Sequence, residues 1–312
     1  MSSIKKLLQR VWVVLFILAA LYFAYSWFRD DAGKAAKLLS ADLGLLGAAA
    51  LSHVAYFIVT VLAWCGSVRL SGERAISFRE GLSQILLVNF GKYIPGKIWG
   101  IAARAAKLKT LGYSLHEITR ASYLEQVLLL LTGFWLAFLA AFLVYEHVIY
   151  IALLLLVSIV LVMMKNGRAV IEFLVRIFPS TRTALAYVDV KIGTAHFSGL
   201  AFAYILVWLT LSASFVFVSL AVMPLETSFH NIVVFVLCLT AGYLAGFLAI
   251  FAPGGLGIRE GVGAGILALL VPLQDAILLM LIFRVWVVFW ELLAGCTLLI
   301  PHKRRGSNVN VD

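Results

Sequence analysis

Long runs of apolar residues are the feature that most constrains what this chain can fold into. A helix needs about 17 to 25 residues to cross the roughly 30 Å hydrocarbon core of a bilayer. The runs that we predict as spans lie at 11–28, 43–66, 120–144, 148–164, 200–222, 231–251 and 275–299, and a weaker eighth lies at 256–272. They lack the period-two alternation of a membrane barrel, and backbone groups must be paired inside lipid, so the spans are predicted to be helices. We therefore expect an all-α, polytopic membrane bundle of about eight spans.

Composition excludes several other classes of protein. Hydrophobic residues make up 63% of the chain and charged residues 13%, which is too apolar for the surface of a soluble fold. The net charge of +10 comes from Lys and Arg at the ends of apolar runs, so anionic lipid explains it better than nucleic acid does. The three cysteines (Cys65, Cys238 and Cys296) lie far apart within or beside apolar runs and predict no disulfide framework. No histidine pair has helical ligand spacing and no Gly-rich phosphate loop is present, so we expect no metal and no cofactor.

The basic residues also predict the orientation in the membrane. Lys and Arg of short loops are held on the cytoplasmic side, and they collect before the first run, after 43–66, after 148–164 and at the end of the chain. This pattern places both termini in the cytoplasm and makes 11–28 a retained anchor. The longest polar connection, 167–198, has Arg168, Glu172 and Arg176 at four-residue intervals and is typical of an amphipathic surface helix. Two interpretations of this helix remain: an ordinary solvated face and a docking site for a partner protein.

A sequence pattern that occurs twice in the chain is the most informative motif. Residues 89–104 read NFGKYIPGKIWGIAAR and residues 247–260 read FLAIFAPGGLGIRE, so an apolar helix twice runs into Pro-Gly and then into a new helix. Proline ends the helix before it, and glycine lets the chain turn sharply. The predicted helix breaks are Pro95, Gly96, Pro253, Gly254, Gly255 and Gly257.

The first break is predicted to be a re-entrant hairpin that opens to the cytoplasm. Its two pieces, roughly 82–92 and 97–108, are each too short to span, and together they would strand four basic residues outside. Paired, interrupted helices are typical of transport sites, whereas two ordinary interfacial turns are the alternative. We therefore predict one transmembrane domain over 1–312, with repeat-like halves at about 40–165 and 200–300 forming a weak inverted repeat.

Basic residues beside both breaks predict an anion site. The unpaired N–H groups at a new helix start favour an anion, and in a membrane phosphate is the obvious one. The candidates for contact with a lipid headgroup are Lys92, Lys97, Arg104 and Arg259. Cations that reach up to lipid headgroups at the surface are the alternative.

Further charges lie where they are costly. Within the membrane each charged group costs about 2.5–3.5 kcal/mol at the centre of a helix, so Glu125, Arg284 and Glu291 are expected to face the bundle interior and find partners. Arg284 and Glu291 are seven residues apart on one face and need a third group, for which Glu125, Arg259 and a substrate headgroup are all open. Glu260 stands beside Arg259, and with Glu125 and Glu291 it would balance the positive charge. A purely structural charge network is the alternative to a site.

At these residues the sequence resembles a known family. The matching pieces are Gly91 to Lys97, the downstream Arg104 and Gly112, the stretch Ser122 to Glu125, and Pro253 to Glu260. They resemble the bacterial flippase-like membrane proteins related to the membrane domain of lysylphosphatidylglycerol synthase, the multiple peptide resistance factor. The resemblance spans about 40–300 and implies a helical membrane domain that moves or binds anionic or aminoacylated phospholipid, or that serves polyprenol-linked lipid pathways.

The leading hypothesis is a lipid flippase or lipid-binding translocator of the bacterial inner membrane. The chain ends soon after its last span, so we expect no soluble aminoacyl-transferring domain and no synthesis of lysyl-lipid. A scaffold for a glycosyltransferase or lipid synthase is the second hypothesis, and an envelope-biosynthesis enzyme would be its partner. A membrane-embedded transferase with Glu125 as general base is the third.

Overall fold

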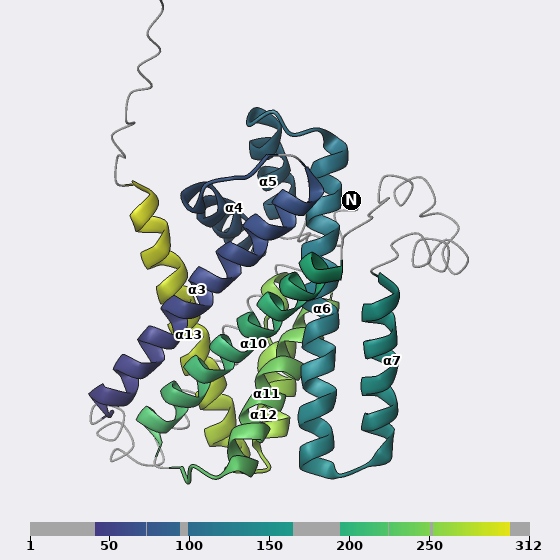
Figure 1. The fold of residues 1–312 in the computed structure, drawn as a ribbon. Coiled ribbons are helices and arrows are strands. Elements are labelled where there is room, and N and C mark those ends of the chain that lie inside the picture. Colours follow the sequence, from purple (N-terminus) through teal and green to yellow (C-terminus); the bar gives the residue numbers. More distant parts are fainter. Residues whose placement is uncertain are drawn as a thin grey trace, which may run out of the picture.

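The computed structural model describes residues 41–72, 74–93, 99–164, 194–223, 225–249 and 252–299. Within these ranges the protein is all-α, with nine α-helices, one short 3₁₀ turn and no strand (Figure 1). The predicted span 11–28, almost all of the surface segment 167–198, both termini, and Pro95, Gly96 and Lys97 lie outside the described residues.

Five of the described helices are long and apolar enough to cross a membrane, and the chain is a multi-pass membrane protein. These helices are α3 (Leu43–Ser71), α6 (Leu115–Tyr145), α10 (Thr194–Val222), α11 (Phe229–Leu248) and α13 (Leu273–Leu299). Two of them start with well-defined side-chain caps: Asp42 accepts from the first N–H groups of α3, and Ser114 forms a reciprocal capping box with Glu117 at α6. A shorter apolar helix, α7 (Val148–Met164), lies against α6.

Three shorter helices, together with α11, form two helical hairpins. In the first, α4 (Phe78–Gly91) and α5 (Trp99–Thr110) run antiparallel at one end of the bundle (Figure 1). In the second, α11 turns at Pro253–Gly255 into α12 (Ile258–Leu267). With 10 residues, α12 is about 15 Å long, so the weak eighth span predicted at 256–272 does not form a full crossing helix.

The two halves of the chain repeat one order of elements: a long helix, a hairpin and a second long helix. The first long helices, α3 and α10, pack antiparallel along their length. The backbone N–H of Asp42 donates to Ala221 at 3.2 Å near one end, and the Ser67 and Tyr204 hydroxyls lie 3.0 Å apart near the other. The halves therefore run in opposite directions at this interface.

Close glycine contacts hold the arms of each hairpin together. A side chain on Gly91 would overlap the backbone of Gly100 on the opposite arm, and one on Gly242 would lie 2.8 Å from the Arg259 carbonyl oxygen. The main apolar core lies between α10, α11, α12 and α13, around Phe215 and Phe283. This packing fixes the second hairpin against α13, where the buried charges lie.

Basic residues gather at one end of the bundle. The C-terminal end of α3, the N-terminal end of α4 and the C-terminal end of α5 carry Arg69, Arg79, Lys107 and Lys109. At the opposite end, the described residues of the connections between α6 and α7, α10 and α11, and α12 and α13 contain no Lys or Arg. The orientation prediction requires Lys and Arg to lie at one end of the bundle, and the described residues have this distribution. The cytoplasmic location of the termini stays a prediction.

Candidate functional site

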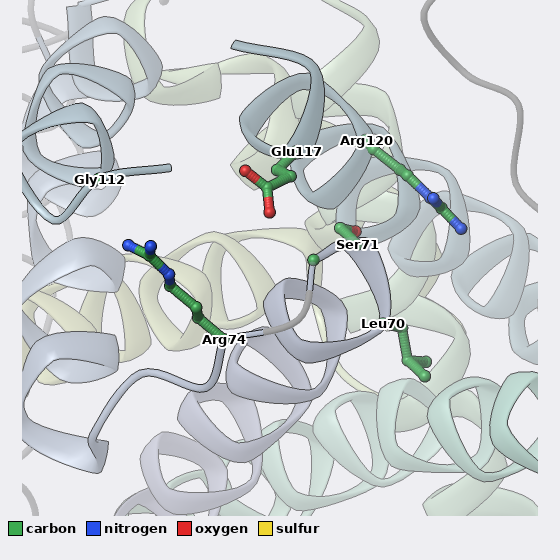
Figure 2. A pocket seen from close by; sticks show the side chains of 7 residues that line it. Leu70, Ser71, Arg74, Gly112, Glu117 and Arg120 are labelled. Carbon is green, nitrogen blue, oxygen red and sulfur yellow. The ribbon is translucent and has the colours of Figure 1, made fainter. Parts of the chain in front are cut away.

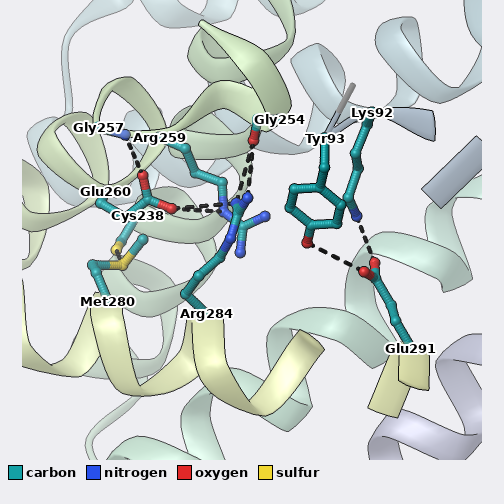
Figure 3. A network of polar contacts seen from close by, with 10 residues as sticks. All are labelled: Lys92, Tyr93, Cys238, Gly254, Gly257, Arg259, Glu260, Met280, Arg284 and Glu291. Carbon is teal, nitrogen blue, oxygen red and sulfur yellow. Dashed lines mark hydrogen bonds and ion pairs between the residues drawn. The ribbon is translucent and has the colours of Figure 1, made fainter. Parts of the chain in front are cut away.

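Charged side chains from both hairpins meet on one face of α13. We call this group the turn cluster, and Figure 3 shows it. Its members are Lys92, Tyr93, Gly254, Arg259, Glu260, Arg284 and Glu291. Arg284 lies eleven residues after the start of α13, about 16 Å along the helix, so the cluster lies near mid-span.

The first hairpin contributes the end of α4. The Lys92 ammonium pairs with Glu291 at 2.5 Å, and the Tyr93 hydroxyl donates to the other carboxylate oxygen of Glu291 at 3.2 Å. Glu291 is buried, whereas 29% of the Lys92 side chain is exposed. The first hairpin is thus tied to the last long helix just before the predicted break at Pro95.

The second hairpin contributes its turn and the start of α12. Gly254 has φ 59°, a left-handed conformation that glycine adopts without strain, and this turns its carbonyl toward α13. Arg284 donates to that carbonyl and to Glu260, in each case at 3.3 Å. The other oxygen of Glu260 accepts from the Gly257 N–H at 2.8 Å, so Glu260 also caps the new helix.

The two hairpins approach each other at this point. A side chain on Gly254 would lie 3.3 Å from the Tyr93 ring and 3.1 Å from the Arg284 guanidinium. The Arg284 guanidinium in turn lies 5.4 Å from the centre of the Tyr93 ring. Tyr93, two residues before Pro95, therefore lies next to Gly254, one residue after Pro253.

Arg259 is the cation of the turn cluster with the longest contact to a carboxylate. Its guanidinium stacks on the Tyr243 ring at 3.6 Å, and only 4% of the residue is exposed. Its Nε lies 4.0 Å from Glu260 Oε1, the same oxygen that Arg284 contacts at 3.3 Å. Within the described part of the chain, Nε and Nη2 of Arg259 have no hydrogen-bond acceptor.

The turn cluster therefore has more positive than negative groups. Three cations (Lys92, Arg259 and Arg284) face two carboxylates (Glu260 and Glu291), and both carboxylates already accept hydrogen bonds. A buried charge is costly unless it is paired and hydrogen-bonded. An anion with several acceptor oxygens would satisfy the remaining guanidinium donors.

Arg104 and Glu125 form a separate pair, between α5 and α6. Both terminal nitrogens of Arg104 contact the carboxylate, at 2.9 Å and 2.5 Å, and the guanidinium lies 3.8 Å from the Trp64 ring. The structure thus brings Lys92 and Arg259 into one cluster and leaves Arg104 outside it. Arg284 and Glu291 do have third groups, but these are Glu260 and Lys92 and not the Glu125 or Arg259 considered from the sequence.

The sequence analysis missed the aromatic partners of the charges. Tyr93 bonds Glu291, Tyr243 stacks on Arg259, and Trp64 stacks on Arg104. Only Tyr93 had a signal, its position inside the first Pro-Gly motif. The other two lie on apolar helices where an aromatic residue gives no sign of a cation partner.

An open pocket of about 490 Å³ lies at the basic end of the bundle, where α3 ends and α6 begins (Figure 2). Its lining residues are Leu70, Ser71, Gly72, Arg74, Gly112, Glu117 and Arg120. Beside it, burial and the nearby Glu117 raise the pKa of Tyr113, whose hydroxyl donates to the Arg74 carbonyl at 3.0 Å. None of the predicted site residues lines this pocket.

Metal ligands do not gather anywhere in the described ranges, where no group of three or more His, Cys, Asp or Glu side chains is close enough to hold an ion. Cys65, Cys238 and Cys296 are free. The chemistry of the turn cluster is therefore that of cations, carboxylates and aromatic rings.

Comparison with known proteins agrees with this architecture. A search of curated proteins found no match. The family model described as the lysylphosphatidylglycerol synthase TM region matches residues 10–295, which is most of the chain and includes both hairpins. The chain therefore belongs to the lysylphosphatidylglycerol synthase transmembrane family.

Proposed function

We propose that this membrane protein binds and translocates a lipid with an anionic, phosphate-bearing headgroup, and that the turn cluster is the headgroup site. The observation that carries the proposal is Arg259, a guanidinium buried at mid-span with two nitrogens that lack a hydrogen-bond acceptor in the described part of the chain. Its nearest carboxylate oxygen is shared with Arg284. Family membership supports a lipid-related role in the membrane.

The chemistry of the cluster suits a phosphate. A guanidinium offers a planar fork of donors that matches two phosphate oxygens, whereas a lysine acts as a point charge. Lys92 is the most exposed cation of the cluster, so it can meet a headgroup before Arg259 does. Tyr93 and Gly254 lie between these cations, where the two hairpins approach. Phospholipids and polyprenol-linked lipids both carry the required group.

We propose movement of lipid and not group transfer as the action. The transferase hypothesis needed Glu125 as a general base, but both of its oxygens contact the Arg104 guanidinium. That ion pair commits Glu125 to the contact between α5 and α6. We propose a bacterial inner-membrane location from the resemblance of the motifs to the flippase-like family, and cytoplasmic termini from the basic residues in the loops.

Translocation of labelled anionic phospholipid by the purified protein in liposomes tests the proposal. Arg259→Gln removes the charge and the fork, and we expect the rate to fall by about 10-fold or more, since a charge-assisted hydrogen bond contributes about 1.5–3 kcal/mol. Arg259→Lys keeps the charge without the fork and should retain an intermediate rate. Arg69→Gln removes an equal charge from the exposed end of α3 and is the matched control.

The result that would overturn the proposal is an unchanged rate for Arg259→Gln in protein shown to be folded. A rate that falls equally for Arg259→Gln and Arg69→Gln would also count against it, because net charge would then explain the effect.

A further inference from the structure

A second group of buried polar atoms lies beside the turn cluster, at the centre of the contact between α3, α10 and α13. We call it the His53 site, and it consists of His53, Ser214, Trp286 and Trp290. His53 is fully buried and is surrounded by the rings of Tyr56, Phe57, Phe283, Trp286 and Trp290. The turn cluster does not use any of these polar atoms.

The hydrogen bonds at Ser214 assign the tautomer of His53. The Ser214 hydroxyl donates its one proton to the Ala49 carbonyl at 3.2 Å and accepts from the Trp286 indole N–H at 3.1 Å. His53 Nδ1 lies 3.1 Å from the same oxygen, and all three contacts can be hydrogen bonds at once only when Nδ1 is the donor. The remaining ring nitrogen, Nε2, therefore carries a lone pair.

Two complementary polar atoms are then left at neighbouring rings. His53 Nε2 is a buried acceptor and Trp290 Nε1–H is a buried donor, and neither has a hydrogen-bond partner in the described ranges. The two rings stack, with centroids 5.7 Å apart and planes inclined by 25°. The five surrounding rings would accept phenylalanine at position 53 without the cost of burying an unpaired nitrogen.

We infer that His53 Nε2 and Trp290 Nε1 bind one neutral hydroxyl group. A group that satisfies both atoms must donate to the imidazole and accept from the indole, which a hydroxyl does and a phosphate oxygen or an ammonium does not. Water and a hydroxyl of a lipid headgroup share this chemistry.

The location makes a headgroup hydroxyl a possible source. Trp290 directly precedes Glu291 of the turn cluster on α13. The Tyr56 ring lies 5.3 Å from that of His53, and Tyr56 is also within electrostatic range of Glu291 and Arg259. An anion at the turn cluster and a hydroxyl at the His53 site would then belong to one headgroup. This source depends on the proposed function, whereas a water molecule does not.

Two lipids of equal charge separate the two sources. Phosphatidylglycerol and phosphatidylpropanol are both singly charged phosphodiesters, and only the first has hydroxyls in its headgroup. If a headgroup hydroxyl fills the site, the wild type should bind phosphatidylglycerol about 3- to 10-fold more tightly, the range for one neutral hydrogen bond. Trp290→Phe and His53→Phe should bring that ratio close to one. Trp135→Phe removes an indole that donates to Ser158, between α6 and α7, and should leave the ratio unchanged.

Solid-state NMR of protein with ¹⁵N-labelled histidine and indole groups, in phosphatidylcholine bilayers, tests the site without any anionic lipid. We expect His53 to be neutral with its proton on Nδ1, and its Nε2 and the Trp290 N–H to be hydrogen-bonded to water. A hydrated site with a lipid ratio of one would support the inference with water as the only occupant. A dry Nε2 and a free Trp290 N–H, together with a ratio of one, would overturn it. If neither anionic lipid binds the wild type, the proposed function fails and the NMR result still decides the hydroxyl site.

Discussion

The two hairpins of this protein each carry a buried arginine on an aromatic ring, but the two arginines differ in how well a carboxylate pairs with them. On the second arm of each, a buried arginine stacks on an aromatic ring: Arg104 on Trp64 at 3.8 Å and Arg259 on Tyr243 at 3.6 Å. Arg104 contacts the carboxylate of Glu125 at 2.9 Å and 2.5 Å, and that carboxylate also accepts from the Gln126 amide at 3.2 Å. Arg259 reaches Glu260 only at 4.0 Å and shares it with Arg284.

This difference separates a structural ion pair from a candidate site. When a carboxylate meets both terminal nitrogens of an arginine, the ion pair has no net charge. Such a pair holds two helices together, and little positive charge remains to attract a ligand. An arginine that competes for its carboxylate leaves positive charge in a medium of low dielectric constant, where an anion gains the most. We therefore expect Arg104 to determine stability and Arg259 to determine binding.

Breaking the Arg104–Glu125 pair should give the largest effect on stability. Arg104→Ala leaves the Glu125 charge buried without its partner, and the free energy of unfolding should fall by about 3–5 kcal/mol. The measurement is unfolding in mixed detergent micelles. The double variant Arg104→Leu, Glu125→Leu removes both charges and should recover most of the loss. A single variant as stable as the wild type would show that the pair is not what holds α5 to α6.

The glycine contacts of the hairpins give the next effect. Gly91→Ala places a methyl group into the backbone of Gly100, and Gly242→Ala places one 2.8 Å from the Arg259 carbonyl. Each should lower the free energy of unfolding by about 1–3 kcal/mol, as overpacking does.

Gly261→Ala is the matched control for these variants. It lies on α12 with no atom near its added methyl group, and it should raise stability by about 0.5–1 kcal/mol through helix propensity. Equal losses at all three positions would show that helix flexibility, and not close approach, is the reason for the glycines.

The sequence predicted the helical membrane fold well because its signal is strong and local. Apolar runs of spanning length correspond to α3, α6, α10, α11 and α13, and the second Pro-Gly motif lies in the turn between α11 and α12. The family assignment is also confirmed over residues 10–295. The weak span at 256–272 was wrong in length because α12 begins at Ile258 and ends at Leu267, before the turn that leads to Pro272, and apolar composition alone does not reveal these ends.

The site was only partly predictable because charge pairing is a property of three-dimensional distance. The cost of a buried charge showed that Arg284 and Glu291 need partners, but not that Glu260 and Lys92 supply them from two different hairpins. Arg104 and Arg259 looked equivalent in sequence. They differ because Glu125 faces one of them from α6, whereas the other shares a carboxylate on its own helix. The roles of Pro95, Gly96 and Lys97 stay predictions, since these residues lie outside the described ranges.

Removing the charge of Arg259 should give the smallest effect on stability, and this contrast tests the comparison most directly. In Arg259→Met, the Glu260 carboxylate keeps its bonds to Arg284 and to the Gly257 N–H, so no buried carboxylate is left without a partner. The methionine side chain still packs on Tyr243, and a surplus buried charge is gone. The free energy of unfolding should therefore stay within about 1 kcal/mol of the wild type or rise slightly. Under the same micelle conditions, a loss as large as that of Arg104→Ala would mean that Arg259 is also a structural ion-pair member, and the distinction between the two hairpins would fail.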